Sequence, residues 1–186
     1  MHYSSNSPDD VLIRGCRRKD RLAQKYLYQR YYGQMLGICM RYTAQRSEAE
    51  DVLNRAFLKV FTAIHQYEPT GSFGGWIARI VFRTAIDYVR QHTRYREVMD
   101  YNLEKEPEIE AEVIDQLFAQ DLFQIIQQLP ATTRAVFSLY VIDGYKHREI
   151  SELLAIKVNT SKWHLAEARK MLQQALKNYH RSKMRS

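Results

Sequence analysis

The sequence predicts an all-α protein of two small helical domains joined by an acidic linker, with a helix-turn-helix in the second domain. Three observations support this fold class. Apolar residues recur every three or four positions in both halves of the chain, as on the buried face of a helix. An acidic run interrupts them, and a short helix, a tight turn and a long basic helix end the chain. We expect the domains at 7–95 and 114–181 and the linker at 96–113.

The charge of the chain is divided into blocks. The whole sequence of 186 residues has a formal net charge of +7. The segment from Glu97 to Asp121 contains nine acidic residues and one basic residue, Lys105, so its net charge is −8. The rest of the chain therefore has a net charge of +15. A segment this acidic, with Pro107 inside it, is typical of a solvated linker. The basic flanks suit a polyanion, although charge alone does not distinguish DNA, RNA, an acidic protein face or a membrane surface.

The first block predicts two helices before residue 40. Ser7 is a candidate N-cap with Pro8 at the first helical position, and the helix should end near Arg18. Asp20 can cap a second, longer helix. The residues of that helix expected to face inward are Leu22, Ala23, Tyr26, Leu27, Tyr31, Leu36 and Cys39.

The third helix has the clearest pattern. Ser47 and Glu50 match a capping box, and Pro69 and Gly71 should follow the helix end. Its apolar positions are Ala49, Val52, Leu53, Ala56, Phe57, Val60, Phe61 and Ile64. Ser72 can then cap a fourth helix.

The fourth helix has an aromatic and apolar face with a polar stripe opposite it. The stripe consists of Arg79, Arg83, Asp87 and Arg90, whose spacing of four, four and three places them on one side of a helix. Two interpretations stay open. The stripe is a solvated face with an Arg83–Asp87 pair, or its arginines contact phosphates and base edges.

The second block predicts four helices. The first two cover about 113–129 and 131–143, and Gly144 is placed for a left-handed helix end. A short helix over 147–154 and a turn over 155–158 lead to a long final helix, which Asn159 or Thr160 would cap. Its inward residues are Leu165, Ala168, Leu172, Ala175, Leu176 and Tyr179.

A short helix, a tight turn and a long basic helix are typical of a helix-turn-helix, whose second helix enters the major groove. The residues expected to be exposed at the start of that helix are Lys162, Trp163, His164, Ala166, Glu167 and Lys170. Trp163 points away from the apolar face, so it either marks a partner surface or packs on the preceding domain.

Several classes of site lack support in the sequence. Cys16 and Cys39 form no metal-binding or redox pair, the six histidines have no ligand spacing, and no hydrolase or nucleotide-binding motif occurs. We therefore expect no enzyme, no metal and no cofactor. No run approaches the roughly 18 apolar residues of a membrane span, so we expect a cytoplasmic protein without membrane insertion.

At this point several segments resemble one family in order and spacing. They are residues 47–61 (SEAEDVLNRAFLKVF), 73–80 (FGGWIARI), 85–90, 129–137 (LPATTRAVF), 144–150 (GYKHREI), 159–162 and 168–169. Together they resemble the extracytoplasmic function (ECF) group of the bacterial sigma-70 family. The resemblance implies a sigma factor that binds core RNA polymerase and promoter DNA, with an anti-sigma factor open as a further partner.

The resemblance also implies which residues carry each role. The polymerase-binding residues would be Glu48, Asp51, Asn54 and Arg55. Those that contact the minus-ten element would be Phe73, Trp76, Arg79, Arg83, Asp87 and Arg90. Those that contact the minus-thirty-five element would be Arg148, Lys162, Trp163, Ala166, Glu167, Arg169 and Lys170.

The main alternative is a stand-alone helix-turn-helix regulator that binds an operator as a dimer. It would leave the third helix and the arginine stripe without a role. A helical bundle that only binds proteins is a further alternative, which failure to bind any nucleic acid would favour.

Overall fold

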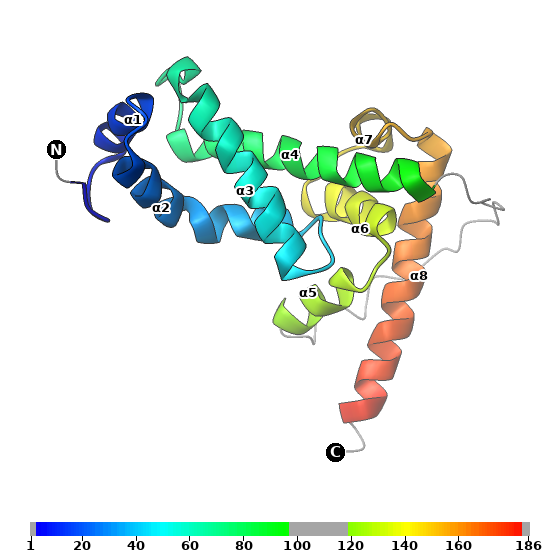
Figure 1. Cartoon of the computed structure of the whole chain (residues 1–186). Coiled ribbons are helices and arrows are strands. Elements are labelled where there is room, and N and C mark those ends of the chain that lie inside the picture. The colour runs from blue at the N-terminus through cyan, green and yellow to red at the C-terminus, as the bar shows by residue number, and fades with distance from the viewer. Residues whose placement is uncertain (1–2, 97–118, 184–186) are drawn as a thin grey trace. The chain divides into compact units, whose positions relative to one another are not determined.

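Figure 1 shows the computed structural model of the chain, in which residues 3–96 and 119–183 are described. Every regular element in these two ranges is a helix. The chain divides into two compact units, Met1–Tyr88 and Val89–Ser186, and the boundary lies inside helix α4 (Phe73–Arg96). No helix in either range is long and apolar enough to span a bilayer. Most of the predicted linker lies outside the described residues.

Unit 1 is built on four helices. They are α1 (Asp9–Arg17), α2 (Arg21–Met40), α3 (Arg46–Ala63) and α4 (Phe73–Arg96), with a 3-10 turn η1 (Ile64–Gln66) after α3. Leu27, Leu53 and Ile77 are fully buried where their apolar faces meet. Asp20 caps α2 as predicted, because its Oδ1 accepts hydrogen bonds from the Leu22 N–H at 2.9 Å and the Ala23 N–H at 3.2 Å. Leu22, predicted to face inward, is 52% exposed instead.

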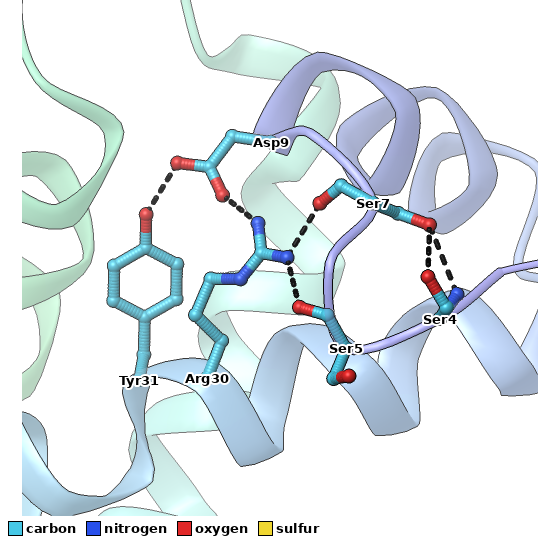
Figure 2. Close-up of polar contacts among 6 residues, drawn as sticks. All are labelled: Ser4, Ser5, Ser7, Asp9, Arg30 and Tyr31. Carbon is cyan, nitrogen blue, oxygen red and sulfur yellow. Dashed lines mark hydrogen bonds and ion pairs between the residues drawn. The ribbon is translucent and has the colours of Figure 1, made fainter.

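A polar cluster fastens the N-terminal segment and α1 to α2 (Figure 2). The carboxylate of Asp9 accepts hydrogen bonds from Arg30 Nη1 at 2.6 Å and from the Tyr31 hydroxyl at 2.5 Å. Arg30 Nη2 also donates to the carbonyls of Ser5 and Ser7. Burial, followed by the hydrogen bond to Asp9, raises the pKa of Tyr31 well above its ordinary value.

The predicted N-terminal cap of α1 is wrong by one residue. The helix begins at Asp9 with Pro8 in the capping position, and the Ser7 hydroxyl accepts a hydrogen bond from the Ser4 N–H instead. Gly15 was not singled out from the sequence. A Cβ there would lie 2.5 Å from the Cβ of Ala23, so α1 and α2 approach each other too closely for a side chain.

The predicted capping box of α3 is also wrong. The helix begins at Arg46, and the Glu48 carboxylate accepts hydrogen bonds from the N–H groups of Ala44 at 2.8 Å and Gln45 at 3.2 Å. Ser47 therefore lies inside the first turn. At α4 the prediction is confirmed, because Ser72 Oγ accepts a hydrogen bond from the Gly75 N–H at 3.1 Å.

Unit 2 contains the helix-turn-helix. Its elements are α5 (Ala119–Gln127), α6 (Ala131–Phe137), a π-helical turn η3 (Ser138–Ile142), α7 (His147–Leu154) and α8 (Val158–Lys183). Both α6 and α7 pack against α8. Leu139, Ile150 and Ala168 are fully buried in this core. The helix predicted over 131–143 is thus an α-helix that widens into a π turn.

The predicted turns of unit 2 are largely confirmed. Gly144 has a φ of +76°, and the short helix covers the predicted residues 147–154. Ala155 ends α7 in the left-handed conformation, with a φ of +56°. The predicted cap of the last helix is wrong, because α8 begins at Val158 and Asn159 and Thr160 lie in its first turn.

A buried arginine joins α5 to α6. Arg134 is 1% exposed, and its Nη1 donates hydrogen bonds to the carbonyls of Gln127 at 2.7 Å and Leu129 at 2.9 Å. Gln127 is the last residue of α5, where helix carbonyls lack partners within the helix, and Leu129 lies in the turn that follows. The guanidinium therefore supplies the cap that connects α5 to the helix-turn-helix.

We predict that Arg134→Met lowers the free energy of unfolding of unit 2 by about 2 to 4 kcal/mol, because the α5 carbonyls lose a charged donor. Urea unfolding in a Trp76→Phe background measures this, since Trp163 fluorescence then reports unit 2 alone. Arg169→Met, at an exposed site, should change the value by less than about 0.5 kcal/mol. Equal effects of the two substitutions would contradict the capping role.

Candidate nucleic-acid and protein interfaces

Helix α3 presents a stripe of exposed side chains, which we call the α3 stripe: Asp51, Asn54, Arg55 and Leu58. They occupy positions i, i+3, i+4 and i+7, which lie on one side of a helix. Leu58 is 68% exposed, the largest exposure among the large apolar side chains of the described residues. Glu48, predicted to belong to this set, instead uses its carboxylate to cap the helix.

Two tyrosines of α2 hold side chains of α3 in place. The Tyr28 hydroxyl donates a hydrogen bond to Asn54 Oδ1 at 2.9 Å, and the Tyr32 hydroxyl donates to Glu50 Oε1 at 2.8 Å. Arg46 lies 3.0 Å from the same Glu50 oxygen. The hydrogen bonds from Tyr32 and Arg46 lower the pKa of Glu50. Tyr28 and Tyr32 were not predicted from the sequence, because their partners lie on another helix.

The polar stripe of α4 is confirmed as a surface feature. Arg79, Arg83 and Asp87 are exposed and Arg90 is half-buried. The Asp87 carboxylate lies 3.5 Å from Lys59 Nζ of α3, so its ion pair is with this lysine and not with Arg83. Arg79 and Arg83 are therefore available to an external anion.

An aromatic cluster lies where α4 begins, formed by Tyr67, Phe73 and Trp76. The Phe73 and Trp76 rings stack at 5.7 Å with an angle of 13° between their planes, and Tyr67 contacts both. Phe73 is buried and supports the cluster from within, whereas Trp76 is half-buried. Tyr67 was missed by the sequence analysis.

A side-chain hydrogen bond joins the two helices of the helix-turn-helix, in addition to their packing. His147 Nδ1 of α7 lies 2.9 Å from Ser161 Oγ of α8. Lys162, Arg169, Lys170 and Arg148 are exposed, whereas Trp163, Ala166 and Glu167 are half-buried. The start of α8 therefore presents three separate cations next to part of an indole ring.

His164, predicted to be exposed, is buried. It is 4% exposed, and its Nδ1 lies 3.0 Å from the hydroxyl of Thr133 on α6. Burial lowers the pKa of His164 from 6.5 to about 4, because the charged imidazolium would lose its hydration. Trp163 packs edge-on against this ring at 4.8 Å. The histidine consequently joins α8 to α6 inside the unit and is not part of the exposed face of α8.

Comparison with known protein families gives two matches. Sigma-70 region 2 matches residues 27–95, and Sigma-70 region 4 matches residues 119–172. The chain belongs to the sigma-70 family. The region 2 match includes α3 and the exposed face of α4, and the region 4 match includes the helix-turn-helix.

Individual sigma factors are similar to this chain. The ECF RNA polymerase sigma factor SigE of Mycolicibacterium smegmatis is 28% identical over 81% of this chain, which spans 60% of SigE. The RNA polymerase sigma-H factor of Pseudomonas aeruginosa is 26% identical over 90% of this chain and 93% of its own length. The solved structure of RpoE with the anti-sigma factor NepR from Bartonella quintana has 20% identity and a TM-score of 0.48, covering 82% of this chain and 96% of RpoE.

These findings place the chain in the ECF group. It is a sigma factor, which binds RNA polymerase and recognises promoters.

We predict that unit 2 of this sigma factor loses stability as the pH falls from about 6.5 to about 4. Between these pH values His164 is largely protonated in the unfolded chain and largely neutral in the folded unit. Falling pH therefore lowers the free energy of unfolding by up to about 3 kcal/mol. Urea unfolding at a series of pH values checks this. His164→Gln retains a hydrogen-bonding side chain and should flatten the pH dependence, whereas the exposed His65→Gln should leave it unchanged. A slope unaffected by His164→Gln would contradict the prediction.

Proposed function

We propose that unit 1 of this sigma factor binds core RNA polymerase through the α3 stripe and contacts the minus-ten element through α4. Unit 2 would read the minus-thirty-five element through the start of α8. The observation that carries this proposal is the separation of two exposed surfaces in unit 1. The α3 stripe mixes an apolar side chain with both charges, whereas the α4 stripe offers arginines whose neighbouring carboxylate is already paired with Lys59.

The α3 stripe has the chemistry of a protein interface. Leu58 supplies an exposed apolar anchor, and Asp51 and Arg55 add opposite charges in the two preceding turns of the helix. Asn54 is held by Tyr28 and so is already oriented before a partner binds. We assign Glu48 an indirect role, because its carboxylate positions the start of the helix.

The α4 surface has the chemistry of a DNA interface. Arg79, Arg83 and Arg90 can donate to phosphates or base edges, and Asp87 keeps Lys59 beside them. The accessible part of Trp76 can stack on a base of the opened strand, with Phe73 supporting it from within.

In unit 2, the start of α8 supplies the side chains that would enter the major groove. Lys162, Trp163, Ala166, Glu167 and Lys170 would face the bases there. Glu167 can accept a hydrogen bond from a cytosine amino group. Two further side chains, Arg148 and Arg169, would bind phosphates and set the position of the protein along the DNA without reading the sequence.

The remaining assignments follow from the sigma role. The acidic linker would pass through basic channels of the polymerase and discourage binding to free DNA, because the net charge of −8 over residues 97–121 repels phosphates. We place the protein in the cytoplasm with the polymerase, without catalytic activity, metal or cofactor of its own. An anti-sigma factor is included among the partners, as in the RpoE–NepR complex.

Run-off transcription with purified bacterial core polymerase and a library of promoter fragments tests the proposal. We expect transcripts from a subset of fragments that depend on this chain. Absence of transcripts, combined with tight binding of a duplex by the chain alone, would favour the operator-binding regulator instead.

Within the α3 stripe, we predict that Leu58→Glu lowers the affinity for core polymerase by about ten- to a hundredfold, because a buried apolar anchor is typically worth about 1 to 3 kcal/mol. Fluorescence anisotropy of labelled sigma factor titrated with core enzyme measures this. Leu22→Glu is the matched control, since Leu22 is also an exposed leucine but lies on α2 outside the stripe. Equal losses from both substitutions would argue against α3 as the docking surface.

A further inference from the structure

We propose that the connection between α1 and α2 is a second phosphate-binding surface of unit 1, and that it binds the DNA backbone next to the strand held at Trp76. We call this surface the basic turn: Arg14, Arg18, Lys19, Arg21 and Lys25. The inference rests on the proposed function, because it extends the minus-ten surface beyond α4.

The basic turn has a high density of exposed cations. Between residues 14 and 25 the chain has six basic residues and one acidic residue. That acid, Asp20, accepts hydrogen bonds from N–H groups in the first turn of α2 and forms no ion pair with the described cations of the turn. Arg14 is paired with Asp10 at 3.0 Å. Among the described residues, Arg18, Lys19, Arg21 and Lys25 form no ion pair, so four charges face solvent.

The backbone of the turn places these side chains at a sharp reversal. The Asp20 N–H donates to the Gly15 carbonyl at 3.1 Å and the Lys19 N–H donates to the Cys16 carbonyl at 2.9 Å, which is the Schellman pattern at a helix end. Lys19 occupies the left-handed position of this motif, with a φ of +59°. Glycine is preferred there because a side chain is strained. A cation is therefore present at the position where a neutral glycine would be more stable.

A single arginine connects the basic turn to the proposed minus-ten surface. Arg17 Nη2 donates a hydrogen bond to the Tyr67 carbonyl at 2.8 Å, and Arg17 Nε donates to the Ile64 carbonyl at 3.4 Å. The Tyr67 ring in turn contacts Phe73 at 4.8 Å and Trp76 at 5.5 Å. In Figure 1 the end of α1 accordingly lies beside η1, against which it packs.

These contacts favour DNA over an acidic protein as the partner. Arg17 and Tyr67 link the basic turn to Trp76 within unit 1, so we expect the backbone of a strand whose base stacks on Trp76 to pass beside the basic turn. Arginine and lysine side chains bind phosphate oxygens without regard to sequence. The surface would then add affinity and register to the complex, and would leave base recognition to α4.

The test compares the salt dependence of DNA binding between two reconstituted holoenzymes, one with the unaltered sigma factor and one with a variant. The variant combines Arg18→Gln, Lys19→Gly and Arg21→Gln, and the probe is a labelled duplex with a premelted bubble. Each lost phosphate contact reduces the slope of log affinity against log salt by about 0.7 to 0.9. We expect a total reduction of about 2, with affinity for core polymerase unchanged.

Single substitutions separate binding from stability. Lys19→Gly relieves the left-handed strain, so we expect it to raise the melting temperature of unit 1 by about 4 °C or more while it weakens DNA binding. A folding defect would lower both. Lys177→Gln, which removes one exposed charge from α8, should leave the salt slope unchanged.

Three results would overturn the inference. An unchanged salt slope in the triple variant with normal core binding would refute the basic turn alone and leave the proposed function intact. A loss of core affinity without a change of slope would identify the turn as a protein contact. Failure of the unaltered chain to bind core polymerase would refute the proposed function and this inference together.

Discussion

The positive charge on the surface of unit 1 depends on how its carboxylates are bound within the unit. Asp9 binds Arg30 and Tyr31, and Asp20 and Glu48 cap helices. Asp87 pairs with Lys59 across two helices. None of these acids forms an ion pair with Arg79, Arg83 or the cations of the basic turn, so those exposed side chains are available to an external anion. A modestly basic composition is thereby converted into local surfaces suited to a polyanion.

In unit 2, buried polar groups orient α8, the helix proposed to read DNA. Arg134 binds the last carbonyls of α5, and His164 pairs with Thr133 inside the core. His147 joins α7 to Ser161 at the start of α8. A buried polar group that loses its partner costs free energy, so these contacts favour one arrangement of the helix-turn-helix. The stability of the unit and the presentation of Lys162 and Trp163 are consequently linked.

The proposed division of tasks between the two units agrees with the chemistry of their different surfaces. The α3 stripe mixes both charges with an exposed apolar side chain at its end, Leu58, as expected of a protein contact. The α4 face and the start of α8 are arginine- and lysine-rich with accessible indole rings at Trp76 and Trp163, as expected of nucleic-acid contacts.

The sequence by itself determined the all-helical fold class, the cap at Asp20, the arginine stripe and the helix-turn-helix, because helical periodicity, turn residues and caps act over a few neighbouring positions. Only the tertiary structure decided that Glu48 caps α3, that His164 is buried, that Leu22 is exposed, and that Asp87 pairs with Lys59. Likewise, Arg17 joins Tyr67 across fifty residues of sequence. Such contacts depend on which faces of different helices meet, and no local pattern encodes that.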